Sequence, residues 1–308
     1  MRILVVGAGA VGGYFGGRLL QASQDVTFLV RPARAGLLEK NGLVLHSPEK
    51  TVAIKSPPTV LEQALTPSFD LILLSCKAYD LENAMDSFSA AVGKQTAILP
   101  LLNGMRHIQI LSDRFGKEKV LGGLCNIVAT LDDSGAVHRM TPVQNITFGE
   151  LDKSVTERVN AIASAFGQAE FNSQQSSDVL LSMWEKWLFL ASLAASTCLM
   201  RAPIGEIVAA PGGKAFILAL IEEIRAIALA NGYSPSVERA HSMLTEPGSP
   251  LTASMYRDLQ NGFRIEADHI VGDLLQRAQQ ANVSSASLIR LQTAYAHLKA
   301  YEQQRNKA

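Results

Sequence analysis

Three glycines near the N-terminus have a spacing that can bring the protein backbone against phosphate groups. Gly7, Ala8, Gly9, Ala10, Val11 and Gly12 read G-x-G-x-x-G, directly after the apolar run Ile3–Val6 and at the start of a helical pattern. In this context Gly7 permits a tight turn, Gly9 lets backbone amides approach a pyrophosphate, and Gly12 lets the helix pack against its strand. The unpaired amides at the helix start attract phosphate. The motif predicts a dinucleotide site, with a ligand-free tight turn as the alternative.

The residues after the second apolar run indicate which dinucleotide is bound. NAD sites usually carry an acidic residue there, but Val26–Val30 is followed by Arg31 and Arg34, and no carboxylate occurs before Glu39. A guanidinium can hold a 2′-phosphate in a bidentate manner. Arg31 therefore favours NADP over NAD, and an ordinary surface cation is the alternative. FAD is less favoured because no second flavin motif follows.

The elements that must position these residues alternate strands with helices in the first half of the chain. This alternation is typical of βαβ units and a parallel sheet. The expected strands are Ile3–Val6, Val26–Val30, Leu71–Ser75, Ala97–Leu99 and Val120–Leu124, and the expected helices include Val11–Gln21 and Leu81–Val92. Two further pairs of runs predict a hairpin insertion (Leu43–Leu45 with Val52–Ile54) and antiparallel strands that close the sheet edge (Ala136–Arg139 with Asn145–Gly149).

The second half of the chain has a helical character. The segment Asn172–Ser177 is polar and turn-prone, and long stretches of helix formers follow it, over Asp178–Met200, Lys214–Asn231, Ser254–Gln280 and Ala286–Gln304. A chain of 308 residues is also long enough for two domains. We therefore predict an α/β Rossmann domain with a mostly parallel sheet over residues 1–172, and an all-helical domain over residues 173–308.

The composition excludes several classes of protein. With 28 basic and 28 acidic residues and 47% hydrophobic residues, the chain has neither the basic excess of a nucleic-acid binder nor the polarity of a disordered chain. The longest apolar stretch, Trp187–Met200, is too short to span a membrane, and the N-terminal apolar run is too short for a signal peptide. We expect a cytoplasmic protein without a nucleic-acid or membrane partner.

The cysteines and histidines show no metal-ligand spacing, so no metal site is expected. Cys76, Cys125 and Cys198 lie far apart in apolar surroundings, as reduced packing residues do. The six histidines are expected to be solvated or locally bonded.

Motifs along nearly the whole chain resemble the ketopantoate reductase (2-dehydropantoate 2-reductase) family. They are the glycine motif, Cys76-Lys77-Ala78-Tyr79, Leu102-Asn103-Gly104-Met105, Trp184-Glu185-Lys186, Ser254-Met255, and Glu266 eight residues after Asp258. The resemblance implies a Rossmann domain joined to a helical domain like that of 6-phosphogluconate dehydrogenase, with the active site between them. It also implies NADPH-dependent reduction of a 2-oxo acid to a 2-hydroxy acid, in the family 2-dehydropantoate to pantoate in pantothenate biosynthesis.

The same resemblance implies roles for individual residues. Lys186 matches the lysine that protonates the carbonyl oxygen, Glu266 a carboxylate near the nicotinamide and the substrate hydroxyl, and Ser254 a substrate-binding hydroxyl. Asn103 matches a contact to cofactor and substrate, Ala129 a backbone contact to NADPH, and Lys77 and Arg31 positions near the ribose and 2′-phosphate. An ammonium is suited to this task, because hydride addition to a ketone builds negative charge on its oxygen.

Structural alternatives remain open for four of these residues. Lys186 could be a cation that reaches out from a helix surface, and Glu266 a solvated carboxylate. Ser254 could simply start a helix, and Asn103 could belong to an ordinary turn.

The chain departs from the family pattern on the helix that carries the lysine. The family has asparagines four and eight residues after the lysine, where this chain has Leu190 and Ala194, and a third that falls near Ile204. Residues 186, 190 and 194 share one helical face. We expect ketone reduction with a preference for a 2-oxo acid that has a more apolar tail. Open alternatives are a relative of glycerol-3-phosphate or opine dehydrogenases and a non-catalytic NADP-binding sensor. A homodimer is a further expectation, assigned to the helical domain.

Overall fold

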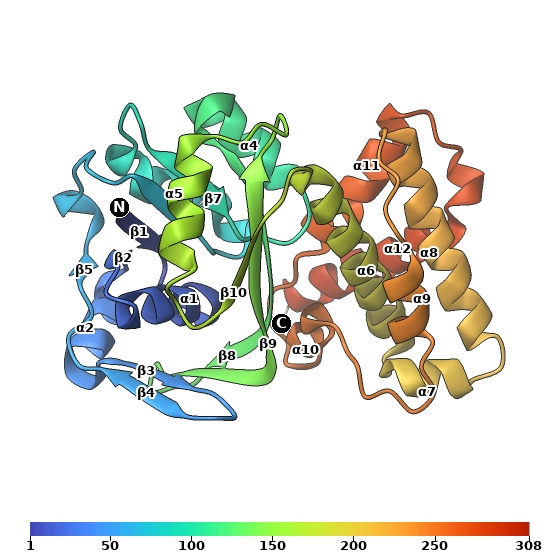
Figure 1. The fold of residues 1–308 in the computed structure, drawn as a ribbon. Coiled ribbons are helices and arrows are strands. Elements are labelled where there is room, and N and C mark those ends of the chain that lie inside the picture. Colours follow the sequence, from blue (N-terminus) through green and yellow to red (C-terminus); the bar gives the residue numbers. More distant parts are fainter. Residues whose placement is uncertain (308) are drawn as a thin grey trace. The chain divides into compact units, whose positions relative to one another are not determined.

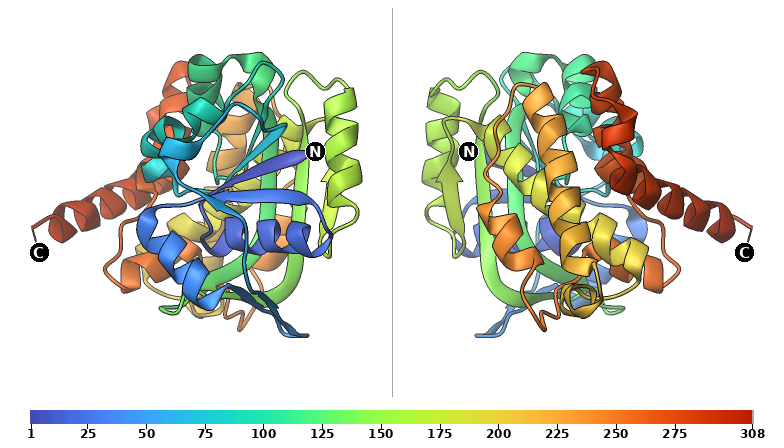
Figure 2. Two further views of the ribbon diagram at one scale, coloured as in Figure 1. Left: turned by 90° about the vertical axis from the view of Figure 1, so that its left-hand side faces the viewer. Right: turned by 90° about the vertical axis from the view of Figure 1, so that its right-hand side faces the viewer.

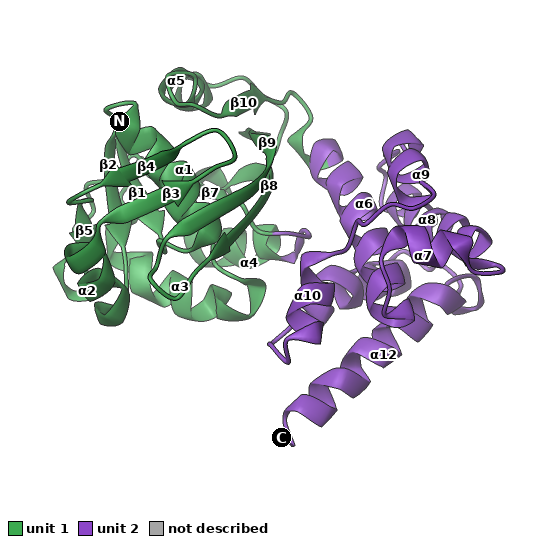
Figure 3. Ribbon diagram, turned by 90° about the horizontal axis from the view of Figure 1, so that it is seen from below, with its two compact units in different colours: residues 1–102, 107–180 green, residues 103–106, 181–308 purple. Residues whose placement is uncertain are grey.

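The computed structural model describes residues 1–307 and divides into two compact units (Figure 3). Unit 1 comprises residues 1–102 and 107–180, and unit 2 comprises residues 103–106 and the chain from 181 onward. The α/β class of the first part and the helical class of the second are confirmed. Residues 173–180, which we assigned to the helical domain, lie in unit 1.

Unit 1 is built on a five-stranded parallel sheet (Figure 1). Its strands are β1 (Arg2–Val6), β2 (Asp25–Leu29), β5 (Thr59–Val60), β6 (Leu71–Leu74) and β7 (Ala97–Pro100), in the order β5-β2-β1-β6-β7. The chain winds outward in both directions from the centre of the sheet, so β1 and β6 flank a topological switch point. Ligands of such sheets bind outside the carboxyl ends of the strands at this point.

Helices cover both faces of this sheet. They are α1 (Ala10–Gln21), α2 (Pro32–Asn41), α3 (Leu81–Phe88) and α4 (Arg106–Phe115), whereas α5 (Glu157–Phe166) packs on β10 (Asn172–Gln175). Successive side chains of a strand point to opposite faces, and β1 follows this rule. Val5 belongs to the core that contains Phe15 of α1, whereas Leu4 belongs to the core that contains Phe88 of α3. The uninterrupted apolar sequence of β1 is therefore explained by burial on both sides.

A second sheet completes unit 1. It contains β3 (Leu43–His46), β4 (Thr51–Ile54), β8 (Leu121–Leu131), β9 (Val137–Glu150) and β10 (Asn172–Gln175), ordered β10-β9-β3-β4, with β8 paired to β9. The predicted β3–β4 hairpin is confirmed. Three other expectations need correction. The run from Val120 starts with a parallel bridge to Ile98 of β7 but continues as β8 of this second sheet. The two runs over 136–149 form the single strand β9, which is antiparallel to β8, and the polar segment from Asn172 forms β10.

These differences have one physical cause, which is that strand pairing depends on the neighbouring strand as much as on the residues of the strand itself. Asn172–Gln175 has a polar, turn-like composition, yet each of its residues pairs in parallel with β9 over Asn145–Phe148.

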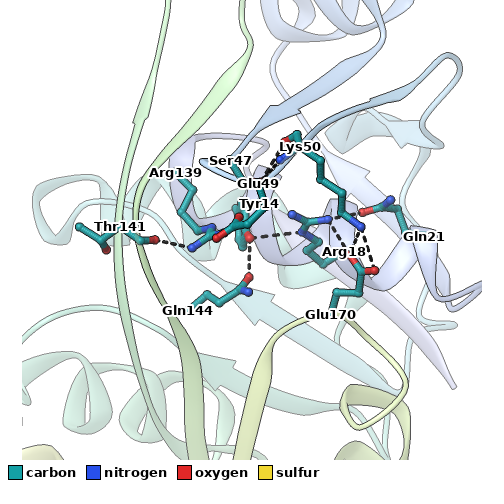
Figure 4. Close-up of polar contacts among 10 residues, drawn as sticks. All are labelled: Tyr14, Arg18, Gln21, Ser47, Glu49, Lys50, Arg139, Thr141, Gln144 and Glu170. Atoms are coloured by element: carbon teal, nitrogen blue, oxygen red, sulfur yellow. Dashed lines mark hydrogen bonds and ion pairs between the residues drawn. The ribbon is translucent and has the colours of Figure 1, made fainter.

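A buried arginine fixes helix α1 within unit 1 (Figure 4). The Arg18 side chain is only 2% exposed, and its Nη1 donates to Gln21 and, at 3.0 Å, to a carboxylate oxygen of Glu170. Its Nε donates to the Tyr14 hydroxyl, which in turn donates to Gln144 of β9. A buried cation needs such partners. Together they tie α1 to β9 and to the segment before β10.

A second buried arginine, Arg139 of β9, lies on the other side of this cluster (Figure 4). Its guanidinium pairs with Glu49 in the β3–β4 turn, donates to the Thr141 carbonyl and lies 5.9 Å from the centre of the Tyr14 ring. The hairpin, β9 and α1 are thus joined around Tyr14, and α1 is the helix that carries the glycine motif at its start.

Unit 2 consists of helices. They are α6 (Val179–Met200), whose first two residues lie in unit 1, α7 (Ile204–Ala209), α8 (Gly213–Ala230), α9 (Glu238–Leu244), α10 (Ser254–Gln260), a π-helix (Asp268–Gly272), α11 (Asp273–Gln280) and α12 (Ile289–Arg305). The last turns of α12 extend beyond the neighbouring helices (Figure 2), and there Tyr301 and Arg305 donate to the carbonyls of Phe263 and Gly262.

The predicted continuous helix over Ser254–Gln280 is wrong. Helix α10 ends at Gln260, and Gly262 then takes a left-handed conformation with φ +72°. Glycine adopts this conformation without steric cost and commonly ends a helix. The chain becomes helical again in the π-helix and α11, which places Glu266 at the start of a separate segment.

One helix among residues 1–307 is long and apolar enough to cross a membrane by length and composition. This helix is α6, and 61% of its most apolar window is buried inside the protein, as in a core helix.

Candidate active site

The glycine loop has the geometry that its three glycines predict. Gly7 has φ +88°, and its amide donates to the Leu29 carbonyl at 2.9 Å. A Cβ on Gly12 would lie 2.2 Å from the Gly7 carbonyl oxygen and 2.4 Å from Ser75 Oγ, so only glycine lets α1 approach this closely. A Cβ on Gly9 would meet nothing within 4 Å. The loop therefore has an open side at Gly9, where its backbone is accessible to an anion.

The other predicted cofactor residues of unit 1 lie on several elements. Arg31 is exposed and precedes α2, directly beyond the carboxyl end of β2, and Lys77 is exposed shortly after β6. Both follow strands that flank β1, so they share its sheet edge. Ala129 lies on β8 of the second sheet, at the register shift after Ile127, opposite Arg139.

Arg34 contacts the glycine loop, although we did not assign it a role from the sequence. Its Nε donates to the Ala8 carbonyl at 2.9 Å, and its Nη2 is buried without a hydrogen-bond partner among the described residues. Burial lowers the pKa of Arg34, and nearby Asp132 opposes this shift. A half-buried guanidinium whose buried Nη2 has an unused donor suits an anionic ligand. Its position one helical turn after Arg31 was the available signal.

Lys186 of α6, in unit 2, follows buried Trp184 by two residues and directly precedes buried Trp187. The rings of Trp184 and Trp187 are 4.9 Å apart, and the Arg277 guanidinium of α11 lies 5.8 and 5.5 Å from their centres. Arg277 is held in turn by Asp273 at 3.1 Å. Cation–π contacts of this kind fix aromatic rings. The backbone on both sides of half-buried Lys186 is therefore anchored to α11.

Glu266 is joined to the Lys186 segment through the π-helix. The indole Nε1 of Trp187 donates to the Ile270 carbonyl at 2.9 Å, and the Ile270 amide donates to the Glu266 carbonyl at 3.0 Å. Glu266 itself is 7% exposed, so the alternative of a solvated carboxylate is wrong. The structure thus brings the segments of two predicted catalytic residues together.

The turn that contains Asn103 also belongs to unit 2 and lies against His269 of the π-helix. His269 forms a hydrogen bond with the Asn103 backbone, and a Cβ on Gly104 would lie 2.9 Å from the His269 carbonyl oxygen. Our expectation of solvated or locally bonded histidines was wrong for His269, which is 7% exposed and bonded to a distant segment, and His107 is fully buried.

The predicted substrate-binding residues lie on α6 and at the start of α10. Because α6 is one continuous helix, Lys186, Leu190 and Ala194 share a face as expected. Leu190 is half-buried and Ala194 is 2% exposed. Ser254 is exposed at the first position of α10, and the preceding Ala253 amide donates to Thr197 of α6 at 3.5 Å. The start of α10 is therefore held against α6 one turn beyond Ala194.

Within residues 1–307, none of the three cysteines forms a disulfide, and burial raises the pKa of Cys198 to about 12. Residues 1–307 contain no group of three or more acidic, histidine or cysteine side chains that could hold a metal ion.

Comparison with known proteins gives consistent matches over both units. The family model described as "Ketopantoate reductase PanE/ApbA" matches residues 3–153, and the model of its C-terminal part matches residues 178–302. An uncharacterized oxidoreductase, YkpB of Bacillus subtilis, is 37% identical over 98% of this chain and 99% of its own. The 2-dehydropantoate 2-reductase of Halobacterium salinarum is 27% identical over 92% and 94% of the two chains.

Solved structures share the fold over nearly the whole chain. A 2-dehydropantoate 2-reductase from Geobacter metallireducens superposes with a TM-score of 0.88 at 24% identity, covering 97% of this chain and 99% of its own. D-mandelate dehydrogenase in complex with NADH and anilino(oxo)acetate superposes with a TM-score of 0.87 at 22% identity, covering 99% and 100%. With both parts matched by the family models, the chain belongs to the ketopantoate reductase PanE/ApbA family of oxidoreductases.

Proposed function

We propose that this protein reduces a 2-oxo acid to a 2-hydroxy acid with NADPH. The observation that carries the proposal is the assembly in unit 2, where the Glu266 segment is bonded both to Trp187, next to Lys186, and to the Asn103 turn. Family membership supports an oxidoreductase that acts on a small keto acid. Retention of the lysine and the carboxylate favours an enzyme over a non-catalytic NADP sensor.

Residues of unit 1 would hold the dinucleotide. The amides of the glycine loop suit the pyrophosphate, and the buried unused donor of Arg34 beside Ala8 fits an anionic group. Arg31 would bind the 2′-phosphate and Lys77 the neighbouring ribose. Bound NADPH supplies the hydride for the reaction. The D-mandelate dehydrogenase of similar fold is found in complex with NADH, and titration of this protein with NADPH and with NADH tests the preference for NADPH.

The residues of unit 2 would stabilise the negative charge on the ketone oxygen and supply its proton. The Lys186 ammonium stabilises the negative charge that develops on the ketone oxygen and then donates a proton to it. Glu266 accepts a hydrogen bond from the hydroxyl that forms, and the Asn103 amide orients the substrate. Ser254 would bind the substrate carboxylate or hydroxyl.

The substrate is expected to have an apolar tail. Leu190 and Ala194 lie on the same helical face as Lys186, at positions where an asparagine amide would hydrogen-bond to a polar substrate tail. Mandelate is a 2-hydroxy acid with a phenyl group. The substrate after which one structural neighbour is named therefore has an apolar tail of the kind expected here. Reduction of 2-dehydropantoate, the cytoplasmic step of pantothenate biosynthesis, is the second candidate, and the relatives of that name support it.

A panel of 2-oxo acids tests the proposal through the loss of NADPH absorbance. We expect kcat/KM for 2-dehydropantoate to be no better than for the analogue that lacks only its hydroxyl. Leu190→Asn should shift this ratio toward 2-dehydropantoate. A parent enzyme that prefers 2-dehydropantoate by roughly a hundredfold would contradict the apolar-tail proposal, since only a site that hydrogen-bonds the hydroxyl discriminates so strongly. Tight NADPH binding without turnover of any 2-oxo acid would favour the sensor instead.

A further inference from the structure

His269 occupies a position that connects two segments of the proposed site. It lies in the π-helix three residues after Glu266, and its side chain hydrogen-bonds to the backbone of Asn103. A π-helix is rare and is frequently found at functional sites. Here it lets the segment from Glu266 to Ile270 contact both the Asn103 turn and Trp187.

The Asn103 turn is shaped to fit this histidine. Gly104 has φ +74°, a conformation that favours glycine. A Cβ at Gly104 would lie 2.9 Å from the carbonyl oxygen of His269 and 3.1 and 3.4 Å from its ring atoms Cδ2 and Nε2. The backbone of the turn therefore packs directly on the imidazole and the backbone of His269, with no room for a side chain between them.

The charges around the ring determine how it bonds. Burial lowers the pKa of His269, Glu266 and Asp273 oppose this shift, and Arg106 adds to it. Burial is the largest of these effects, so the pKa of His269 lies below its usual range. Since the hydrogen bond with Asn103 favours the protonated ring, the ring donates and the Asn103 carbonyl accepts.

We propose that His269 is a positioning residue that fixes the Asn103 turn and thereby sets the rate of reduction. The imidazole holds the backbone of Asn103, and the segment that supplies the imidazole also presents Glu266. The side chains of Asn103 and Glu266 thus keep one fixed separation. This role rests on the proposed reduction of a 2-oxo acid, and nothing in it requires His269 to touch the substrate.

A matched pair of variants separates the hydrogen bond from the packing. His269→Leu keeps the approximate volume and removes the donor, whereas His269→Gln retains an N–H donor. For His269→Leu we expect kcat to fall roughly 10- to 100-fold, the effect of a small displacement of a positioning group, with the KM for NADPH little changed. His269→Gln should recover most of this loss. Equal losses in the two variants would overturn the proposal.

A double-mutant cycle tests whether His269 acts through Asn103. In the Asn103→Ala background, His269→Leu should cause little further loss of kcat, because coupled residues are not additive. Fully additive losses would contradict the proposed coupling.

Hydrogen–deuterium exchange tests the positioning without any turnover. His269→Leu should speed exchange of the amides over 103–106 by about tenfold and leave α8 and the strands of unit 1 unchanged, and His269→Gln should restore protection. Unchanged exchange over 103–106 would refute the structural part of the proposal. If the parent reduces no 2-oxo acid, the proposed function fails, while exchange still shows whether His269 fixes the turn.

Discussion

Substitution by alanine at two glycines of the same loop should affect the free energy of unfolding differently. A methyl group at Gly12 would lie 2.2 Å from the Gly7 carbonyl oxygen, a backbone atom that cannot move aside without shifting α1 from β1. Overpacking of this kind costs about 1–3 kcal/mol. Gly9 has φ −81° and an open side. Gly9→Ala should therefore leave the unfolding free energy unchanged or raise it by about 0.4–1 kcal/mol, because alanine restricts the unfolded chain.

Gly9→Ala should bind the dinucleotide much more weakly than the parent, although its stability is normal. The added methyl group stands on the open side of the loop and keeps a pyrophosphate from the backbone amides. Loss of one hydrogen bond to a charged group costs about 1.5–3 kcal/mol, which corresponds to an affinity roughly 10- to 150-fold weaker.

Two measurements on each variant check this reasoning. Thermal and urea unfolding without ligand report stability, and fluorescence titration with NADPH reports affinity. Gly12→Ala should lose stability and affinity together, whereas Gly9→Ala should lose affinity alone. If Gly9→Ala bound NADPH as tightly as the parent, the loop would not be the phosphate site. If Gly12→Ala were as stable as the parent, our account of the contact between α1 and β1 would be wrong.

Three further outcomes are expected. Arg31→Ala should weaken NADPH binding by roughly 10- to 150-fold and leave NADH binding nearly unchanged; equal affinity of the parent for both dinucleotides would refute the assignment. Lys186→Ala should lower kcat by about 10²- to 10⁴-fold with NADPH affinity retained, and normal turnover would exclude it as the proton donor. Burial opposes ionisation of Glu150, but hydrogen bonds from Arg158 and Thr156 lower the pKa of Glu150 below 4.5. The ionised Glu150 side chain therefore stabilises the fold above that pH, and this contribution should disappear as the pH falls through the lowered pKa. In urea unfolding, Glu150→Gln should therefore be less stable than the parent at about pH 7 and approach it in acid, and a constant difference would contradict the ion pair.

The local order of the amino acids was sufficient to predict many of the strands and helices. An apolar run followed by G-x-G-x-x-G predicts a strand, a turn and a helix, because each of these preferences acts over a few neighbouring residues. For the same reason β1, α1, the β3–β4 hairpin and helices α6, α8 and α12 were predicted with nearly correct bounds. Lys186, Leu190 and Ala194 could be placed on one face because helical spacing alone determines that relation.

Only the tertiary structure decided how segments far apart in the sequence pair. The polar segment from Asn172 forms β10 because β9 offers it free hydrogen-bonding groups, a partner that its own composition does not reveal. The π-helix that follows the break at Gly262 depends on the packing of unit 2, where the Trp187 indole N–H donates to the Ile270 carbonyl. The contacts of Arg34 with Ala8 and of His269 with Asn103 were not found from the sequence for the same reason. Each contact joins residues that are distant along the chain, and no local spacing encodes the distance between them once the chain has folded.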